Sequence, residues 1–440
     1  MNFDRMRALL LDQAIRGELV PQLAKEGVVK QIGSLPTHIP HSIPVSWKWV
    51  QLPEVVYFQE GPGILKVDFH DSGIPLIRIS GMSEEYVTLE GCNYLDPAKV
   101  EEKWKHFRLD IGDVLISSSA SLDRVSKVGE EAKGAIPYTG LIRFKSKGLI
   151  DLDYFILFVK SQCFIDQINK NKTGTTIKHF GPTHLKKMVI PVPPLLEQAR
   201  IVAKLEEAFA EIDRAEKAYE ELQTLSGVLR GQILQEAIQG KLVPQLDSEE
   251  EVQQIGDAPE DVPFAIPEKW KWVQLKSVGT VIGGGTPKTS VSEYWGDDVS
   301  WITPADLGKN SSKWIQKGAK SITQKGLDES SAKLMPKGSV VYSSRAPIGH
   351  IAIAGQELCT NQGCKSFVPN EEVISTEWAY YMLIARTKDI QSRASGTTFK
   401  EISGKGVGET WITLPPLEEQ KRIVAKIEDL LKQVDALSGK

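Results

Sequence analysis

A regular spacing of apolar residues in the middle of the chain predicts one long helix. Between residues 201 and 233, apolar or small residues recur at alternating intervals of four and three, the heptad spacing of a helix packed against another helix. Those positions are Ile201, Leu205, Ala208, Ile212, Ala215, Tyr219, Leu222, Ser226, Leu229 and Ile233. Pro193-Pro194 ends any helix before this segment, and Gly240 and Pro244 end the helix after it. About 40 residues at about 1.5 Å each give a rod of roughly 60 Å.

The two ends of the chain carry the same spacing and are natural partners for this helix. Residues 9–15 continue it, and residues 417–437 repeat it at Ile423, Ile427, Leu430 and Val434. We expect both segments to pack antiparallel to the central helix. A heptad pattern of this length usually indicates packing rather than chemistry. We therefore expect the rod to hold two bodies apart at a fixed distance.

Two globular bodies are predicted between the helices, at about residues 53–190 and 276–412. Short runs rich in apolar and β-branched residues predict strands in both bodies. The runs are residues 75–79, 113–116 and 155–159 in the first body and residues 299–302 and 339–342 in the second. The predicted fold class is α+β, with two pseudo-symmetric globular domains separated by an antiparallel pair of long coiled-coil-like helices.

The segments that flank the bodies occur twice, about half a chain length apart. The copies are residues 14–23 with 237–246, 47–52 with 270–275, and 193–204 with 415–426. A repeat this long indicates two copies of one module and two similar surfaces for partners. The predicted parts are an N-terminal helix at 1–25 that belongs to the second spacer, a first domain at 40–190, a central helical spacer at 191–245, a second domain at 263–412 and a C-terminal helix at 413–440.

Composition and charge limit the classes of function. The net charge is −4, but residues 160–187 hold six lysines against one aspartate, and acidic residues concentrate in the predicted central helix. Both runs are also typical of a solvated face. No apolar run is long enough to span a bilayer, so we expect a cytoplasmic protein. The four cysteines are too scattered for a disulfide scaffold, and the seven histidines show no metal-ligand spacing.

Two loop sequences shared by the bodies are candidates for contacts with nucleic acid. Residues 173–179 and 395–401 place small hydroxyl residues around a glycine, followed by a lysine. This composition suits a phosphate, although an ordinary turn fits it as well. Residues 112–119 and 338–345 are predicted strands that run into hydroxyl-rich loops, where Arg345 can make a bidentate contact to guanine; a strand-end turn with a surface arginine is the alternative.

The sequence lacks the usual signatures of catalysis and of nucleotide binding. Residues 283–289 look like a phosphate loop, but Pro287 stands where the Gly-Lys-Ser/Thr ending needs glycine. There is no Asn/Asp-Pro-Pro-aromatic segment, G-x-G-x-x-G, H-E-x-x-H or G-x-S-x-G motif. A self-sufficient methyltransferase or nuclease is therefore disfavoured, and a binding protein that positions another component is favoured.

In the order of its parts, the chain resembles the specificity (S) subunits of type I restriction–modification systems. The resemblance covers nearly the whole chain and rests most specifically on the exit motif Pro-Pro-Leu-x-Glu-Gln-x-x-Ile-Val after each body. The second body is similar to common members at residues 283–287, 293–296 and 361–363. The first body departs from them, with Glu60-Gly61-Pro62 at its entry and Tyr138-Thr139-Gly140 in place of Asn-Gln-Gly.

The resemblance implies that each body is a target recognition domain that reads one half of a split, asymmetric DNA site, with the helices setting the gap. It implies two modification (adenine methyltransferase) subunits docked on this chain, motor-nuclease restriction subunits that join for cleavage, and no membrane partner. No catalytic residue, metal or cofactor is expected on the chain itself, because S-adenosylmethionine is expected on the modification subunits. The predicted DNA-binding residues are Ser117, Ser118, Thr175, Thr176, Lys178, His179, Thr286, Lys288, Ser343, Ser344, Arg345, Thr397, Thr398 and Lys400.

A function of another class is left open by the sequence. The chain can be a non-catalytic coiled-coil scaffold whose bodies bind protein or glycan partners. The acidic net charge and the ten tryptophans motivate this alternative.

Overall fold

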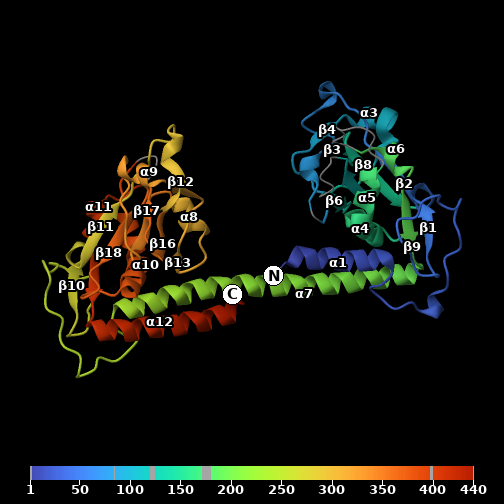
Figure 1. Cartoon of the computed structure of the whole chain (residues 1–440). Coiled ribbons are helices and arrows are strands. Elements are labelled where there is room, and N and C mark those ends of the chain that lie inside the picture. Colours follow the sequence, from blue (N-terminus) through green and yellow to red (C-terminus); the bar gives the residue numbers. More distant parts are fainter. Residues whose placement is uncertain (1, 84, 119–123, 171–179, 397–399, 440) are drawn as a thin grey trace. The chain divides into compact units, whose positions relative to one another are not determined.

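The computed structural model describes residues 2–83, 85–118, 124–170, 180–396 and 400–439. The chain divides into two compact units, Met1–Ala218 and Tyr219–Lys440, and each contains one body and one pair of helices (Figure 1). The helix α7 (Leu195–Ile238) contributes its first half to unit 1 and its second half to unit 2. In the described ranges, no helix has the length and apolar character needed to cross a bilayer.

Unit 1 begins with a helix, continues with the first body and ends in α7. Its strands are β1 (Lys48–Gln51), β2 (Val56–Glu60), β3 (Ile74–Ile77), β4 (Asn93–Leu95), β5 (Val114–Ser117), β6 (Val125–Lys127), β7 (Ile136–Pro137), β8 (Leu141–Ser146) and β9 (Val189–Val192). Its other helices are α1 (Phe3–Arg16), α2 (Leu52–Val55), α3 (Pro97–Lys99), α4 (Leu152–Lys160), α5 (Gln162–Lys170) and α6 (Pro182–Leu185).

Unit 2 begins in α7, continues with the second body and ends in a helix. Its strands are β10 (Lys271–Gln274), β11 (Gly279–Gly283), β12 (Trp295–Ile302), β13 (Trp314–Ile315), β14 (Lys320–Ile322), β15 (Val340–Ser344), β16 (Ile348–Ala354), β17 (Cys359–Thr360), β18 (Lys365–Pro369) and β19 (Trp411–Leu414). Its other helices are α8 (Pro304–Lys309), α9 (Gln324–Asp328), α10 (Thr376–Ser392), α11 (Gly404–Gly408) and α12 (Leu417–Ser438).

The two bodies share one sheet topology although their sequences differ. The larger sheet of unit 1 has the order β2-β8-β5-β6, and that of unit 2 has β11-β18-β15-β16 with β13 added at the edge. The smaller sheets, β4-β3-β7 and β14-β12-β17, each combine an antiparallel pair with a parallel pair. A two-stranded ribbon, β1 with β9 or β10 with β19, completes each unit. The repeat at the ends of the bodies therefore extends through their interiors.

Residues 155–159 are helical, so the strand predicted there is wrong. They lie in α4, whose cap Asp151 accepts hydrogen bonds from two amides of the first turn. The buried residues Phe155, Phe158 and Val159 follow the spacing of a helix face. A short apolar run does not distinguish a buried helix from a buried strand, which explains the error. The other four predicted runs overlap β3, β5, β12 and β15.

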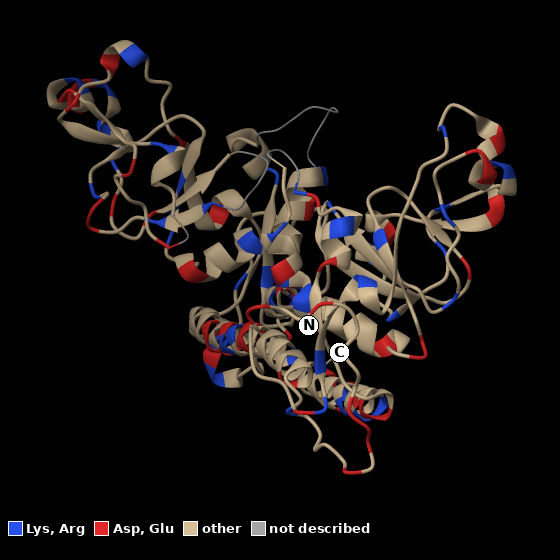
Figure 2. Ribbon diagram, turned by 90° about the vertical axis from the view of Figure 1, so that its left-hand side faces the viewer, with Lys and Arg blue, Asp and Glu red and all other residues tan. Residues whose placement is uncertain are grey.

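Each unit pairs its part of α7 with one terminal helix, as the heptad spacing predicts. In unit 1, Arg7 on α1 forms an ion pair of 2.6 Å with Asp213. In unit 2, Arg230 on α7 forms an ion pair with Asp435 on α12. Both pairs are antiparallel (Figure 1), and acidic and basic residues lie close together along the helices (Figure 2).

A buried tryptophan joins each body to its helix. Trp47 Nε1 donates to Glu197 Oε1 at 3.0 Å in unit 1, and Trp270 Nε1 donates to Glu419 Oε2 at 2.9 Å in unit 2. All four side chains are buried, and burial raises the pKa of both carboxyl groups above the ordinary value for glutamate. A buried polar group without a partner destabilises the fold, so each side chain favours the position that satisfies the other.

The glutamine of the exit motif links the spacer helix to a helix inside the body. Gln198 accepts from the amide of Asp151 at 2.7 Å, and Gln420 accepts from the amide of Ser375 at 2.8 Å. Asp151 and Ser375 are the N-terminal caps of α4 and α10. One side chain therefore fixes the starts of two helices relative to each other in each unit.

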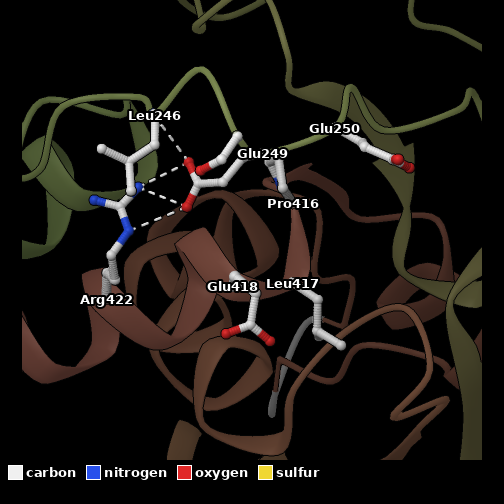
Figure 3. A pocket seen from close by; sticks show the side chains of 8 residues that line it. Leu246, Glu249, Glu250, Pro416, Leu417, Glu418 and Arg422 are labelled. Carbon is white, nitrogen blue, oxygen red and sulfur yellow. Dashed lines mark hydrogen bonds and ion pairs between the residues drawn. The ribbon is translucent and has the colours of Figure 1, made fainter.

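An arginine of the exit segment binds the chain that enters the body. Arg422 donates to Glu249 from Nε at 3.1 Å and from Nη2 at 2.8 Å, beside an open pocket (Figure 3). Arg200 donates to Glu26 in the same way, at 2.8 and 2.7 Å. Because the motif residues Glu, Gln and Arg all hold the body or its entry segment, they recur in both units while the bodies differ.

A glycine lets the entry segment approach the end of a helix. Gly240 follows α7 with φ +71°, and a Cβ there would lie 2.2 Å from Cγ of Pro267. Gly17 follows α1 with φ +77°, and a Cβ there would lie 2.5 Å from Cγ of Pro44. A side chain at either position would be strained both by the left-handed backbone and by the proline.

Replacing Gly240 with alanine should destabilise unit 2. The left-handed conformation alone disfavours a non-glycine residue by about 1–3 kcal/mol. The matched control is Gly231→Ala in the interior of α7, where a Cβ would meet open space and alanine should stabilise the helix by about 1 kcal/mol. Thermal unfolding of the full chain should shift down by roughly 2–4 °C for each kcal/mol lost. Equal midpoints for the two variants would contradict this account of the junction.

Candidate nucleic-acid interface

Four loop segments of unit 2 meet at one end of its larger sheet. The strands β11, β18 and β15 are neighbours, and their register places Gly283, at the end of β11, opposite Lys365, at the start of β18. Ser343, near the end of β15, bridges the residue before β18. The fourth segment joins them because Arg345 forms a β-bridge with Glu401. The loops that the sequence singled out in the second body therefore lie together.

Charged side chains from three of these segments form a network. Arg345 Nη1 lies 3.5 Å from Glu401 Oε2, and Lys365 Nζ lies 3.7 Å from Glu401 Oε1. Lys365 also donates to the carbonyl of Gln362 at 2.8 Å, and Gln362 Oε1 accepts from the hydroxyl of Thr286. Arg345 is 35% exposed and Glu401 is 40% exposed. Two of the predicted residues, Arg345 and Thr286, thus belong to one network that solvent reaches.

The glycine of the Asn-Gln-Gly segment makes room for the arginine. A Cβ at Gly363 would lie 2.9 Å from Pro304 Cγ and 3.3 Å from Arg345 Nε. The carbonyl of Gly363 also accepts from the amide of Ser344 at 2.8 Å. The main chain at Gly363 therefore binds the end of β15, and the lack of a side chain there leaves room for Arg345.

The predicted serines of unit 2 are buried and hydrogen-bonded. Ser343 Oγ donates to the carbonyl of Pro347 at 2.7 Å and accepts from the amide of His350 at 2.7 Å. Ser344 Oγ donates to the carbonyl of Gly363 at 3.1 Å. In this structure both hydroxyls stabilise the loop, and contact with a base edge would require these bonds to break.

Two predicted lysines of unit 2 are exposed, and six predicted residues of the two units lie outside the described ranges. Lys288 and Lys400 are exposed, as a phosphate contact requires. The predicted residues that lie outside the described ranges are Thr175, Thr176, Lys178, His179, Thr397 and Thr398.

Unit 1 repeats the main-chain arrangement of these loops. The amide of Ser118 donates to the carbonyl of Gly140 at 2.8 Å, as the amide of Ser344 does to Gly363. Ser117 and Ser118 are buried, like their counterparts in unit 2. Equivalent strands, β2, β8 and β5, supply the loops. The sheet topology therefore fixes a common frame at this end of both bodies.

The side chains on this frame differ between the units. Glu60 ends β2 where Gly283 ends β11, and its Oε1 accepts from the amide of Gly140 at 3.3 Å. The guanidinium of Arg78 lies 5.6 Å from the ring centre of Tyr138, a distance suited to a cation–π contact. Unit 1 thus offers a carboxylate and an arginine beside an aromatic ring where unit 2 offers two cations around Glu401.

Sequence reasoning did not identify several members of these clusters. Glu401 ends the loop sequence that both bodies share, and Gln362 lies in the segment that resembles the family, so both carried a signal. Lys365 and Arg78 carried none, because an isolated basic residue near a strand is typical of a solvated surface. Only the folded sheet brings these two cations to the loops.

Metal-ligand clusters and reactive thiols would be further candidate sites in the described ranges. Within those ranges, no group of three or more His, Cys, Asp or Glu side chains is arranged to hold a metal ion. Burial raises the pKa of the Cys359 and Cys364 thiols to about 12. Both thiols are therefore protonated at neutral pH and are poor nucleophiles.

Comparison with known proteins connects these features to one family. The family model of the type I restriction modification DNA specificity domain matches residues 44–224 and 267–440. The type I restriction enzyme MjaIX specificity subunit of Methanocaldococcus jannaschii is 39% identical over 172 residues, which are 38% of this chain and 40% of that protein. The putative MjaX specificity subunit of the same organism is 27% identical over 402 residues, 89% of this chain and 88% of that protein.

Solved structures share the fold. The HsdS subunit of Thermoanaerobacter tengcongensis aligns with a TM-score of 0.60 at 23% identity, over 90% of this chain and 92% of that chain. A chain from a structure of the type I R-M system aligns with a TM-score of 0.67 at 24% identity, over 91% of this chain and 93% of that chain. The predicted architecture of two bodies with paired helices is thus confirmed.

Replacing Gly363 with alanine should weaken DNA binding more than it weakens the fold. The added methyl group would lie 2.9 Å from Pro304 Cγ and 3.3 Å from Arg345 Nε, so both neighbours would have to shift. A base contact of the kind predicted for Arg345 is worth about 1–3 kcal/mol. The control is Gly283→Ala in the adjoining loop, where the nearest atom, Lys365 Cδ, would lie 3.8 Å away. Binding titrations should show a Kd about tenfold higher for Gly363→Ala than for the control. The same Kd for both variants would show that this space is not needed for binding.

Proposed function

The chain belongs to the family of type I restriction–modification DNA specificity subunits, and on this basis we propose that each unit reads one half of a split, asymmetric DNA site. The family match supports DNA specificity over the alternative of a scaffold for protein or glycan partners. In this proposal, the body of unit 1 is the first target recognition domain and the body of unit 2 is the second.

The observation that carries the proposal is the common loop frame with different side chains. Main-chain bonds at Ser118 and Ser344 are the same in the two units, so both bodies present their loops on an equivalent scaffold. The side chains on it differ, because Glu60 stands where unit 2 has Gly283. Arg345 likewise stands where the sequence of unit 1 has Ser119. Because sequence is read by side-chain contacts to base edges, different side chains on one frame favour two unequal half-sites.

The helices are proposed to set the gap between half-sites and to dock partner subunits. On α7, Leu225 and Val228 are 64% and 63% exposed, and Leu229 is 42% exposed. Val228 also lines a groove between α7 and α10, together with Gly231 and Ile384. Apolar surface of this kind is typical of an interaction site. We assign it to one modification subunit, with a second modification subunit on the helices of unit 1.

In this proposal, the partner subunits carry out the chemical reactions. Modification subunits would bind S-adenosylmethionine and methylate adenine, and motor-nuclease subunits would join for cleavage. This chain would supply base recognition and position its partners, with no catalytic residue and no cofactor of its own.

The direct test of the function is co-expression with the cognate modification subunits, followed by methylation mapping of genomic DNA. The proposal expects methyladenine in both halves of one split motif whose halves differ. A stable complex that methylates no defined motif would contradict it.

Substituting Arg345 should relax the choice of base at one position of one half-site. A bidentate arginine–guanine contact contributes about 1–3 kcal/mol of discrimination, so Arg345→Ala should bind the cognate site and its single-base variants at that position about equally. Lys400→Ala is the comparison: it should weaken binding to all duplexes and lower the salt slope by about 0.9. Competition binding with a set of single-base variants measures both effects. If Arg345→Ala lost the same affinity for every duplex in the set, a role of Arg345 in base readout would be excluded.

Placing a charge on the exposed face of α7 should remove one partner. Val228→Asp puts a carboxylate where the apolar contact is proposed, and the residue is exposed enough for the fold to tolerate it. Native mass spectrometry should find one modification subunit per chain instead of two. The control is Val45→Asp, at a 92% exposed residue outside the helices. Two bound modification subunits in both variants would show that the modification subunit docks on another surface.

A further inference from the structure

A single carboxylate lies between the two cations of the unit 2 loop cluster. Glu401 approaches Arg345 at 3.5 Å and Lys365 at 3.7 Å. Both distances exceed the roughly 2.7–2.9 Å of a strong charge-assisted hydrogen bond. These ion pairs are therefore easily exchanged for the acceptors of a ligand, yet they bias where the two cations point.

The main chain, and not the ion pairs, holds Glu401 in place. Its amide donates to the carbonyl of Ser395 at 2.9 Å, and its carbonyl accepts from the amide of Ser395 at 3.1 Å. The amide of the next residue, Ile402, donates to the carbonyl of Ser344 at 3.1 Å. Because these bonds fix the backbone, the half-exposed carboxylate is not needed to hold the loop. Its charge can therefore contribute to DNA recognition.

A carboxylate on a DNA-binding surface opposes phosphate binding. Attraction to phosphates supplies essentially all non-specific affinity, and it carries no sequence information. A glutamate that neutralises two nearby cations therefore weakens binding to every duplex, including those of the wrong sequence. Where base-edge contacts replace the lost phosphate attraction on the correct sequence, the loss falls mainly on wrong sequences, and this difference raises discrimination.

The same kind of group lies at the equivalent end of unit 1, supplied by another segment. Glu60 ends β2 and contacts the amide of Gly140, whereas Glu401 follows the loop that leads to α11. In unit 2 the residue equivalent to Glu60 is Gly283. In each unit a carboxylate thus lies at the loop cluster, but it comes from a different segment of the chain.

We propose that Glu401 is a positioning residue for sequence readout: its carboxylate orients Arg345 and Lys365 toward base edges and withholds them from phosphates. This inference rests on the proposed DNA-reading function and assigns a specificity-determining role within it. When the cognate site binds, acceptors on the bases take over the donors that Glu401 holds in the free protein. On a wrong sequence those acceptors are missing, and Glu401 retains the cations.

The test uses the full chain in complex with its modification subunits and the variant Glu401→Gln. Titrations at several salt concentrations give Kd for the cognate duplex and for an unrelated duplex. We expect affinity for the unrelated duplex to rise about threefold to tenfold, with a salt slope steeper by about 0.9 because one more phosphate is contacted. Affinity for the cognate duplex should stay the same, so the ratio of the two Kd values should fall by the same factor.

Two further variants isolate the effect of the charge. Glu401→Asp keeps the negative charge and should retain low affinity for the unrelated duplex. Glu409→Gln removes a carboxylate of similar exposure, 37%, that pairs with Lys405 at a similar distance, 3.8 Å, and should change nothing. An unchanged ratio of Kd values in Glu401→Gln, or an equal loss of affinity for both duplexes, would overturn the inference while leaving the proposed function intact. A wild-type complex that binds both duplexes equally would instead overturn the proposed function and this inference with it.

Discussion

A buried hydrogen bond between an indole and a glutamate is the contact on which the rest of each unit depends. In both units the tryptophan precedes the body and the glutamate begins the spacer helix, so the bond closes the body onto the helix. Neighbouring glutamine and arginine side chains extend the same junction to an inner helix and to the entry segment. Because the segments that enter and leave the body are both held at the junction, the loops at the other end of the larger sheet can differ. Such differences do not change how the body is attached.

This separation of roles explains where the two copies agree and where they differ. Junction residues are nearly identical in the two copies because each satisfies a buried partner, and a buried group without its partner is costly. The solvent-exposed side chains of the loops are not under this constraint. The backbone bonds around Ser118 and Ser344 set the frame, and side chains such as Glu60, Arg345 and Glu401 give each frame its own charge. Recognition can therefore vary while the fold and the attachment to the helices remain constant.

The sequence predicted what depends on local periodicity and on the repeat, but not what depends on distant contacts. The heptad spacing and the flanking prolines and glycines located α7 and α12, because these signals are local. The Trp47–Glu197 contact joins residues 150 positions apart, so the repeated blocks indicated importance without indicating the pairing. Residues 155–159 were mistaken for a strand because their run is too short to show its period. Lys365 became a site residue only through the sheet register, and the buried state of Ser343 could not be read from a hydroxyl-rich loop.

In the proposed function, a constant junction carries interchangeable bodies, and the bodies determine specificity. The most direct measurement is methylation mapping with a chimera in which residues 53–190 are replaced by a second copy of residues 276–412, co-expressed with the same modification subunits. The account predicts a stable complex that methylates a split site made of two copies of the half-site originally read by unit 2. A folded chimera in a stable complex that still methylates the original asymmetric site would contradict it.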